Sequence, residues 1–586
     1  MILLVKFYTL SKIEEQKERN RFKEKIMLKK FIWLFLLWVL LFSVSGSSHS
    51  FETCEKSDLA PSPAVGHQGM VSSAHPLATQ SGLEILKKGG NAFDAAVTVA
   101  SVLNVVEPMM SGIGGYGTIL IYDAAKRKIR FLDSSGKIPQ AVDSDVFRAP
   151  NPGYRQNRKG PKSVSTPGNV NAWEALSKEY GLLKWKDLFD PAVRLASDGF
   201  ELSDSTAGMI ASAFFSFPEC AKEFYGRDGQ PLKAGEKLIQ KDLADSFRKI
   251  AAEGAKAVYG GSIGLAIDKA MKQSGGFLSL DDLVEDKAEW WEPIHIEYRG
   301  FQVYTASPPS TAFPSLIRLG MMSLYDAKSL GHNSVDYLHY FAEVTKHAFW
   351  CRLAYAGDPE IDPPPLENLL SKKYWEQQNN KIEINKVKPF VPPEAIIKEG
   401  KNTTHFVVAD RWGNIVCATQ TLGNAFGSRI MPEGTGIWLN NSLAYCTFEP
   451  KGNPMDAHAG HRKLSGDCPT IILKKGRPWA ALGTPGGHTI GQTVPQMVMN
   501  LIDFEMNIQE AITAPRISFV EPDLIFVEEK IREEIRSSLA ARGHNIRITK
   551  GLGNAHGLSI EYDDEGRPIR FLGGADYRGQ GTALGY

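Results

Sequence analysis

The sequence predicts an α+β protein in which antiparallel sheets are packed between layers of helices. Helical and strand-like segments interleave along the chain, and hairpins dominate its last third. The strand-like runs 405–409 and 415–421 flank one polar turn, and the runs 470–473 and 479–482 flank another. Such hairpins favour an antiparallel sandwich over a doubly wound parallel sheet, because parallel strands need long crossover connections.

Two consecutive helices are expected near the start of the globular part. The first covers residues 79–88 and ends at Gly89-Gly90, and the second covers residues 92–106. The second is almost entirely small or apolar, so we expect it to be buried. The glycine cluster 111–117 (SGIGGYG) follows a helix and leads into a strand at 118–122. A dinucleotide-binding loop has the opposite order, with the strand before the loop and the helix after it. The cluster therefore predicts a close-packed turn.

The rest of the chain supplies the helical layers. Amphipathic stretches at the spacing of a helix recur through its middle and once more near its end, and they are residues 171–180, 185–198, 242–253, 335–356 and 492–503.

Composition excludes several classes of protein. The 586 residues include 67 Lys and Arg and 66 Asp and Glu, which gives a net charge of +1. A nucleic-acid-binding protein would need an excess of basic residues, so this balance argues against a nucleic-acid partner. Six Cys residues with no CxxC pattern provide neither a disulfide scaffold nor a zinc site. His458 and His461 are a weak metal signal and are expected to be two solvated loop histidines. We therefore predict no metal and no cofactor.

Residues 1–50 are interpreted as an N-terminal extension and a signal peptide. The apolar run Phe31–Phe42 is shorter than the roughly 20 residues needed to span a bilayer. Lys29 and Lys30 precede it and small residues follow it, as in a secretory signal whose true start is Met27. Export to the periplasm or the exterior is expected, with no membrane span left after cleavage. The alternative is an anchor formed by an uncleaved segment.

Four stretches resemble the gamma-glutamyltranspeptidase family of N-terminal-nucleophile hydrolases. They are ATQSGLEILKKGGNAFDAAVTVA (78–100), GPKSVSTPGNVNAWEAL (160–176), NTTHFVVADRWGNIVCATQTL (402–422) and GTPGGHTIGQTVPQMVMNLID (483–503), and the C-terminal GGADYRGQGTALGY is similar too. The resemblance implies a four-layer αββα sandwich formed jointly by two chains of a self-cleaving precursor. These are a large chain of residues 51–402 and a small chain of residues 403–586, which stay associated.

Thr403 is the expected nucleophile. If the Asn402–Thr403 bond breaks, Thr403 gains an α-amine with a pKa of roughly 7.7–8, which can act as general base for its own hydroxyl. The same hydroxyl can make the cut by attacking the Asn402 carbonyl, giving an ester that water hydrolyses. Thr421 resembles the second threonine of the family, which orients the nucleophile. Gly486-Gly487 resembles its oxyanion hole, where residues without Cβ let N–H groups approach closely.

The substrate-binding positions depart from the family. In the family, an arginine binds the α-carboxylate of the donor, and the corresponding position in this sequence is near Ser135. An aspartate of the family binds the α-amine of the donor, and the corresponding position is near Tyr445. The family's supporting asparagine and glutamine correspond to Gly423 and Ser442 in this sequence. Its pair of adjacent serines corresponds to Ser465-Gly466, so only one serine is kept. Losing two charge-assisted hydrogen bonds of about 1.5–3 kcal/mol each would weaken binding of a glutamyl group roughly 10²–10⁴-fold.

Other residues are candidates to replace the family's arginine and aspartate, the two ionic residues that bind the head group of the donor (the head-group clamp). Lys137 or Arg429 could replace the Arg and Asp467 could replace the Asp, the alternative for each being a plain surface charge. Cys446 and Cys468 flank Tyr445 and Ser465. They either form a disulfide across the pocket rim or remain buried free thiols.

The leading hypothesis is a self-processing amide hydrolase or acyltransferase that takes a small-molecule amide donor, γ-glutamyl compounds first, and water or an amine as acceptor. Relatives with this signature include cephalosporin acylases and amidohydrolases of small acids such as oxamate, so a non-glutamyl acyl amide is the alternative. A hypothesis of another class is an inactive binding protein on the same scaffold. The retained Asn402, Thr403 and Thr421 argue against it.

Overall fold

Two seven-stranded antiparallel sheets form the centre of the structure, a computed structural model that describes residues 62–393 and 402–586. The strands of the first sheet are, in spatial order, β1 (Ala64–Gly66), β20 (Pro568–Ala575), β19 (His556–Tyr562), β15 (Arg477–Gly483), β14 (Thr470–Lys474), β11 (Phe301–Thr305) and β10 (Ile294–Tyr298). Those of the second sheet are β21 (Thr582–Gly585), β2 (Gly69–Ser73), β12 (Asn402–Asp410), β13 (Ile415–Gly423), β3 (Tyr116–Asp123), β4 (Lys128–Ser134) and β9 (Glu289–Trp291).

The residues of β12 show why these strands are apolar on both faces. Val407 and Ala409 belong to the buried cluster between the two sheets, whereas Phe406 and Val408 belong to the cluster beneath the helices. Successive side chains of a strand point to opposite faces, so a strand that is covered on both sides must be apolar at every position. This accounts for the continuous run that the sequence shows there.

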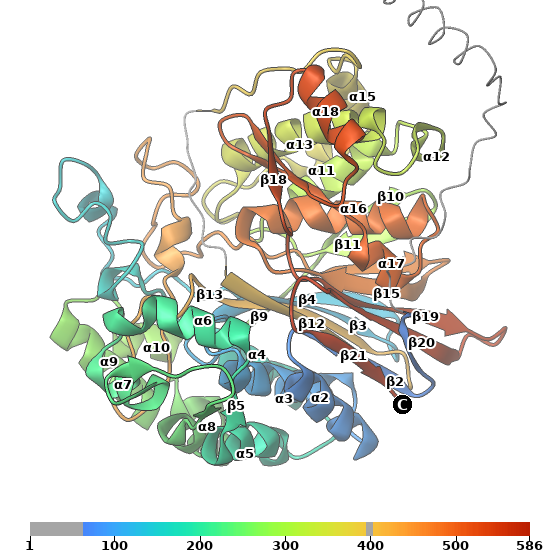
Figure 1. Cartoon of the computed structure of the whole chain (residues 1–586). Coiled ribbons are helices and arrows are strands. Elements are labelled where there is room, and N and C mark those ends of the chain that lie inside the picture. Colours follow the sequence, from blue (N-terminus) through green and yellow to red (C-terminus); the bar gives the residue numbers. More distant parts are fainter. Residues whose placement is uncertain (1–61, 394–401) are drawn as a thin grey trace, which may run out of the picture. The chain divides into compact units, whose positions relative to one another are not determined.

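Helices cover the outer face of each sheet and complete the four layers (Figure 1). Over the second sheet lie α2 (Pro76–Lys87), α3 (Ala92–Val106), α4 (Asn169–Tyr180), α5 (Asp190–Asp198), α6 (Asp204–Ala213), α7 (Glu219–Tyr225), α8 (Lys241–Glu253), α9 (Ser262–Ser274) and α10 (Leu280–Glu285). Over the first sheet lie α11 (Phe313–Met322), α12 (Ala327–Leu330), α13 (Val335–Tyr355), α14 (Leu366–Leu369), α15 (Lys372–Asn379), α16 (Ile490–Ile502), α17 (Ile508–Thr513) and α18 (Glu533–Ala541). The predicted αββα sandwich is confirmed.

Three smaller sheets complete the secondary structure of the described residues. They consist of β16 (Ile517–Val520), β17 (Leu524–Glu528) and β18 (Ile546–Thr549), of β5 (Phe200–Glu201) and β8 (Lys237–Leu238), and of β6 (Gly226–Arg227) and β7 (Gln230–Pro231).

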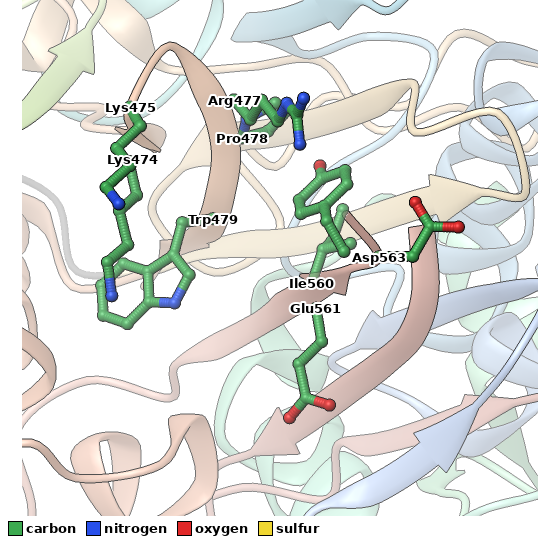
Figure 2. A pocket seen from close by; sticks show the side chains of 9 residues that line it. Lys474, Lys475, Arg477, Pro478, Trp479, Ile560, Glu561 and Asp563 are labelled. Carbon is green, nitrogen blue, oxygen red and sulfur yellow. The ribbon is translucent and has the colours of Figure 1, made fainter. Parts of the chain in front are cut away.

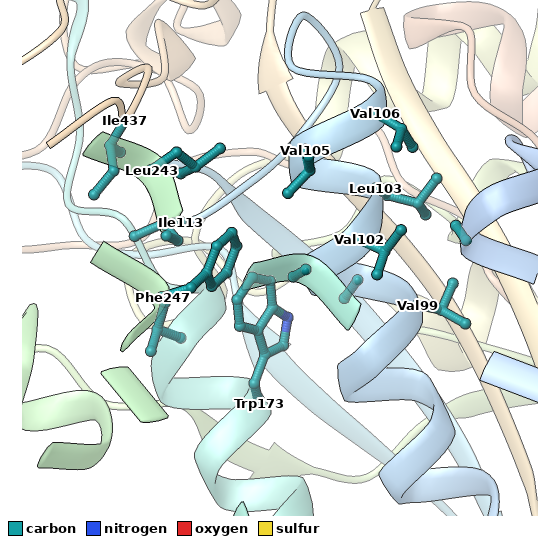
Figure 3. Close-up of a cluster of buried hydrophobic side chains, with 14 of the residues drawn as sticks. Val99, Val102, Leu103, Val105, Val106, Ile113, Trp173, Leu243, Phe247 and Ile437 are labelled. Atoms are coloured by element: carbon teal, nitrogen blue, oxygen red, sulfur yellow. The ribbon is translucent and has the colours of Figure 1, made fainter. Parts of the chain in front are cut away.

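Helix α3 is buried along its whole length, as its composition predicts. The side chains of Val99, Val102 and Leu103 belong to a buried cluster that also contains Trp173 of α4 and Phe247 of α8, with Val99 and Leu103 on the side of α3 away from Trp173 (Figure 3). This cluster fixes the first helical layer over the sheet that carries Thr403.

The turn between β12 and β13 is built around one carboxylate. Asp410 accepts hydrogen bonds from the N–H groups of Trp412 and Asn414, both at 3.0 Å, and from Ala92 at 2.9 Å. Gly413 adopts a φ of 85°, which favours glycine. The hairpin is thereby attached to the N-terminus of α3, and its open end lies at the opposite end of the strands.

Several element boundaries differ from the sequence prediction, and two of these differences involve a proline. Residues 185–189 form a separate 3-10 turn before α5, where Pro191 occupies the first turn of the α-helix. Helix α16 begins at Ile490, two residues before the predicted start, and accommodates Pro495 within its length.

The predicted signal segment, including Phe31–Phe42 and Met27, lies outside the described residues. Within residues 62–393 and 402–586, the structure contains no helix with the length and apolar character that crossing a bilayer requires.

Candidate functional site

Thr403 and Thr421 lie at the open end of the β12–β13 hairpin, one on each strand. The register pairs Asn402 with Gly423 but Thr404 with Gln420, so the ladder is irregular where Thr403 faces Thr421. Such a bulge leaves a residue outside regular pairing and changes the direction of its side chain. Both threonines are buried.

The two hydroxyls are connected to the backbone carbonyl that self-cleavage would attack. The Thr403 hydroxyl donates to Thr421 Oγ1 at 3.3 Å, and Thr421 Oγ1 in turn donates to the carbonyl oxygen of Asn402 at 2.6 Å. The N–H of Gly423 donates to Thr421 Oγ1 at 2.8 Å and holds that hydroxyl in place. Thr421 therefore contacts both the predicted nucleophile and the predicted scissile peptide.

The neighbouring Thr404 points to the other face of the strand and binds a residue that the sequence analysis did not single out. Its hydroxyl donates to Glu107 Oε2 at 3.0 Å, just beyond the C-terminal end of α3. Burial raises the pKa of Glu107 to about 7. This contact ties the first residues of the predicted small chain to the helical layer.

The first sheet approaches the same end of the hairpin. A Cβ built on Gly483 would lie 2.3 Å from the ring of His405, so only glycine permits this contact between the sheets. His405 is buried, and burial lowers its pKa well below the usual range, which keeps the ring neutral. Gly486 and Gly487 follow three residues after this contact.

Gly486 and Gly487 adopt conformations that favour glycine. Their φ angles are 140° and 60°, and a Cβ on Gly486 would lie 2.4 Å from Thr489 Oγ1. Gly487 opens a 3-10 turn that leads directly into α16. Peptide N–H groups at the start of a helix are suited to bind an oxyanion.

Ser135, at the position of the family's arginine, lies beside a buried ion pair and not beside a free cation. The Ser135 hydroxyl donates to Asp133 Oδ2 at 2.9 Å. The same carboxylate accepts from Nε of Arg462 at 3.0 Å, and Arg462 also pairs with Glu289 at 2.6 Å. Since this guanidinium pairs with three carboxylates, Glu360 at 3.7 Å being the third, it is not available as a direct replacement for the family's arginine.

Tyr445 lies beside the strand that carries the site. It occupies a 3-10 turn (Ser442–Tyr445). Burial and the neighbouring Tyr445 both raise the pKa of Tyr116, whose backbone pairs with Thr421 across β3 and β13. Ser442 begins this turn and hydrogen-bonds to the Ser165 hydroxyl. Tyr445 is thus in the neighbourhood expected of it, whereas the hydroxyl of Ser442 is occupied by another side chain.

Ser465 is held by the residue that was a candidate to replace the family's aspartate. Its hydroxyl donates to Asp467 Oδ2 at 2.9 Å, and Thr118 of β3 donates to the same oxygen at 3.2 Å. Burial raises the pKa of Asp467 to about 7, while the hydrogen bond from Ser465 opposes this shift. Gly466 lines a small pocket together with Gly487, so the structure brings these two predicted site residues together.

Lys463 is the cation that sequence reasoning missed. The residue is 1% exposed, and its Nζ lies 3.2 Å from the centroid of the Tyr116 ring. No described residue forms a hydrogen bond with this Nζ. Burial lowers the pKa of Lys463 to about 7, and Asp467 opposes the shift. Its place two residues before Ser465 was the signal that could have found it.

The two cations proposed from sequence, Lys137 and Arg429, have different surroundings. Lys137 is exposed and contacts Arg462 through a backbone bridge, and the guanidinium of Arg429 hydrogen-bonds to Ser216. The exposure of Lys137 agrees with the alternative of a plain surface charge, and a role of either residue in replacing the family's arginine stays a prediction. Of the three candidate replacements, Asp467 is the one whose side chain hydrogen-bonds to a predicted binding residue, Ser465.

Cys446 and Cys468 are free thiols, so the disulfide considered for them is not formed. The thiol of Cys446 packs in a small cluster with Leu443 and Ala457, whereas that of Cys468 lies near the hydroxyls of Thr305 and Ser315. Different packing surroundings separate the two side chains, in agreement with the alternative of buried thiols.

His461 is less solvated than the sequence indicates. Its Nδ1 lies 3.4 Å from Asp358 Oδ2, and Glu360 is nearby, so donor atoms of these three residues lie within 4.8 Å of one another. The Asp358 carboxylate already accepts from the N–H groups of Glu360 and Arg462. The absence of a metal therefore stays a prediction.

A larger hollow elsewhere contains none of the predicted site residues. Figure 2 shows it beside Arg477, Trp479 and Asp563, at the hairpin end of β14 and β15. Gly483, the residue nearest the candidate site on β15, lies at the other end of that strand.

The fold is that of the N-terminal-nucleophile hydrolases: a four-layer αββα sandwich, in which here a threonine at the start of a central strand faces a second threonine. Comparisons with known proteins identify the family. A model of the gamma-glutamyltranspeptidase family matches residues 78–586, and the chain belongs to that family.

Curated relatives extend over most of the chain. It is 33% identical over 551 residues to a glutathione hydrolase proenzyme of Bacillus subtilis (strain 168), covering 89% of this chain and 92% of that protein. It is 35% identical over 549 residues to the acylase ACY 1 proenzyme of Pseudomonas sp. (strain SE83), covering 91% and 95%.

Among solved structures, cephalosporin acylase from Bacillus halodurans matches with a TM-score of 0.82 and 27% identity, covering 93% of this chain and 99% of that one. Helicobacter pylori gamma-glutamyltranspeptidase matches with a TM-score of 0.53 and 32% identity, covering 55% and 94%. The relatives thus include both glutathione hydrolases and acylases.

Proposed function

We propose that this protein is a self-processing amide hydrolase or acyltransferase that forms an acyl-enzyme on Thr403. The observation that carries the proposal is the chain of hydrogen bonds from Thr403 to Thr421 and from Thr421 to the carbonyl of Asn402. A donor aimed at that carbonyl stabilises the negative charge that develops on its oxygen when the hydroxyl attacks.

Self-cleavage would proceed through an ester. The Thr403 oxygen attacks the carbonyl carbon of Asn402, the peptide C–N bond breaks, and the nitrogen leaves as the α-amine of Thr403. Water then hydrolyses the ester, which frees the hydroxyl and leaves a carboxylate on Asn402. In the mature protein the α-amine removes the proton of the hydroxyl as the donor amide is attacked. Gly486 and Gly487 would bind the oxyanion of that reaction.

The donor we favour carries a carboxylate, as γ-glutamyl compounds such as glutathione do. Support comes from Lys463, which is buried beside Tyr116 without a hydrogen-bond partner among the described residues. A buried ammonium is costly unless an anion compensates it, and a donor carboxylate would do so. Tyr445 and Asp467 lie in the same neighbourhood and would face the rest of the donor's head group.

A second candidate donor is a small acyl amide without the glutamyl head group, of the kind that cephalosporin acylases or oxamate amidohydrolases use. Two observations favour it. Ser135 and Tyr445 stand near the positions where the family has the arginine and the aspartate that bind the glutamyl head group. A cephalosporin acylase is also structurally similar over almost the whole chain. The nucleophile and its self-cleavage would be the same for both donors.

Intact mass spectrometry of the purified protein, followed by incubation with a γ-glutamyl anilide and with glutathione, tests the proposal. We expect two masses separated before Thr403 and release of glutamate. Two masses without γ-glutamyl turnover would select the second donor class. A single uncut and inactive chain would contradict the proposal and favour a binding protein. Addition of glycylglycine as acceptor then separates transfer from hydrolysis.

We further propose that the protein is exported and that the signal segment within residues 1–50 is removed. N-terminal sequencing of protein from culture supernatant and from cell fractions tests this. A membrane-bound chain that retains Phe31–Phe42 would favour the anchored alternative.

A further inference from the structure

The hollow in Figure 2 is a gap between two neighbouring strands of the first sheet. The pairing of β15 with β19 covers Ala480–Gly483 of β15 and ends there. Beyond that point, residues 477–479 and 560–563 line a pocket of about 570 Å³ together with residues 474–475. We call it the strand-end pocket. Its volume is within the range of sites that hold small molecules.

The local sequence explains why the two strands part. Pro478 has no N–H group, so it cannot continue the pairing as a donor. The register between β14 and β15 also shifts between Ile472 and Leu473, and Trp479 is the extra residue of the resulting bulge. A bulge bends its strand and redirects the side chains beside it. The gap is therefore built into the sheet.

Apolar and aromatic side chains form the walls of the strand-end pocket. Pro478 and Ile560 are buried, and Trp479 and Tyr562 are half-buried. The Trp479 ring packs against that of Phe301, with the ring centroids 4.8 Å apart, and is held in place by this contact. Aromatic side chains present flat faces on which a planar ring of a ligand can stack.

A buried hydroxyl in this pocket has no partner. The hydroxyl oxygen of Tyr562 is shielded from solvent and forms no hydrogen bond with the described residues. Burial raises the pKa of Tyr562 above its ordinary value, so the hydroxyl keeps its proton and remains a donor. A buried donor without an acceptor costs free energy, and an acceptor oxygen of a ligand would remove that cost.

Arg477 is placed to bind an anion beside this hydroxyl. Its guanidinium packs on the turn that follows β19, where a Cβ on Gly566 would lie 2.3 Å from the guanidinium carbon. Its charge lowers the pKa of Tyr562 against the larger effect of burial, as expected of two groups near each other. Arg477 forms no ion pair with a carboxylate of the described residues. Its planar fork of N–H donors matches the oxygens of a carboxylate or phosphate.

The other charges of the lining also favour an anion. Figure 2 shows Lys474 beside the ring of Trp479, with its Nζ 5.6 Å from the ring centroid. Neither Lys474 nor Lys475 pairs with a carboxylate in the part of the chain that the structure describes. The two carboxylates of the lining, Glu561 and Asp563, each pair with an arginine outside it.

We infer that the strand-end pocket binds an organic anion in which a flat ring carries a phosphate or carboxylate group. The anionic group lies against Arg477 and the Tyr562 hydroxyl, and the ring lies against Trp479. Gly483, the residue of β15 nearest the predicted nucleophile, is at the other end of that strand, so this site is separate from the one described above. The inference does not rest on the proposed amide hydrolysis.

Titration calorimetry with defined probes tests the inference. Adenosine 5′-monophosphate carries a ring and a phosphate, adenosine carries the ring alone, and ribose 5-phosphate carries the phosphate alone. At matched ionic strength, adenosine 5′-monophosphate should bind at least about 10-fold more tightly than either fragment, because it combines stacking with a charge-assisted hydrogen bond. 1-Naphthoate, with a carboxylate on a ring, shows which anionic group the pocket prefers.

Variants then locate the binding. Arg477→Met should raise the Kd of the ring-bearing anion about 10- to 100-fold, and Tyr562→Phe should raise it about 2- to 10-fold. Arg248→Met, which removes an exposed arginine of α8, is the matched control and should leave Kd unchanged. Arg477 is exposed, so its replacement should not prevent folding.

The inference is overturned if neither ring-bearing anion binds more tightly than the fragments, or if Arg477→Met binds them as well as the unsubstituted protein does. Self-cleavage and amide turnover should be the same in Arg477→Met as in the unsubstituted protein. Because calorimetry requires no turnover, its result stands even if the proposed amide hydrolysis fails, and the two proposals can fail separately.

Discussion

The hydroxyl of Thr421 lies 2.6 Å from the carbonyl oxygen of Asn402, eighteen residues after the nucleophile in sequence but opposite it across a hairpin. It accepts from Thr403 while it donates to the carbonyl that Thr403 would attack. In the proposed reaction this one side chain would position the nucleophile and polarise the scissile peptide. The predictions below begin from this relationship.

Removal of the Thr403 hydroxyl should stop self-cleavage. Thr403→Ala is expected to remain a single chain and to be inactive, while Thr403→Ser, which keeps a hydroxyl, should split and retain part of the activity. Gel electrophoresis and intact mass measure the products. A Thr403→Ala protein that splits between residues 402 and 403 and turns over amides would mean that another residue is the nucleophile.

Thr421→Ala should slow cleavage without preventing folding. The variant loses the hydrogen bonds to Thr403 and to the Asn402 carbonyl, and loss of such a donor typically costs about 3 kcal/mol of transition-state stabilisation, roughly a hundredfold in rate. Thr421→Ser should cleave at nearly the normal rate. The time course of precursor splitting after purification checks both, and equal rates for the two variants would contradict the role given to Thr421.

Lys463→Met should discriminate between donors. We expect KM for γ-glutamyl and glutaryl anilides to rise about 10- to 100-fold, because a charge-assisted hydrogen bond contributes about 1.5–3 kcal/mol. KM for a butyryl anilide should change little. Lys137→Met is the matched control, since that side chain is exposed. A uniform loss for all donors would indicate that Lys463 acts only on stability.

The preference for carboxylate donors should depend on pH. Because burial lowers the pKa of Lys463 to about 7, its ammonium is present below that pH and is lost as pH rises through it. We expect the ratio of kcat/KM for γ-glutamyl over butyryl anilide to fall between about pH 6 and pH 8. The ratio cancels the titration of the Thr403 amine, which affects both donors alike. A ratio that stays constant up to pH 9 would contradict the assignment.

Asp576→Ala should destabilise the fold. Asp576 is 2% exposed, pairs with both Arg516 and Arg578, and accepts from the N–H of Ala555 at 3.0 Å. Its removal leaves the buried guanidinium of Arg516 without its carboxylate, while Arg578 keeps its pair with Glu528, and breaking a buried pair typically costs about 3–5 kcal/mol.

Denaturant unfolding of Asp576→Ala and of a control, Asp563→Ala, measures this effect. Asp563 pairs with the exposed Arg567, so its loss should change the unfolding free energy little. Equal stability of the two variants would show that the buried network is dispensable.

Much of the fold could be predicted from the sequence because local patterns specify it. The all-apolar stretch Ala92–Val106 is a buried helix, and the runs either side of Asp410–Asn414 pair as the expected hairpin. Thr403 and Thr421 could also be predicted to meet, since a hairpin brings the start of one strand opposite the end of the next. The glycine turn 111–117 packs closely, with a Cβ on Gly115 2.5 Å from the carbonyl of Thr421.

The full set of residues that would bind the substrate could not be predicted from the sequence in this way. Sequence offered Lys137 or Arg429 as candidates for the replacement cation, with a plain surface charge as the alternative for each, and it did not single out Lys463, which the structure places over Tyr116. Strand periodicity determines which face a residue occupies, but it does not determine which loop covers that face. Lys463 lies on such a loop, more than three hundred residues from Tyr116.

The sequence by itself thus determined the layered fold, the family resemblance and the candidate nucleophile, because each depends on spacing along the chain. Only the tertiary structure decided which charges are buried together: Lys463 with Asp467, and Arg462 with Asp133. The physical reason is that the cost of a buried charge depends on neighbours brought by other elements of the fold. No local pattern specifies those neighbours.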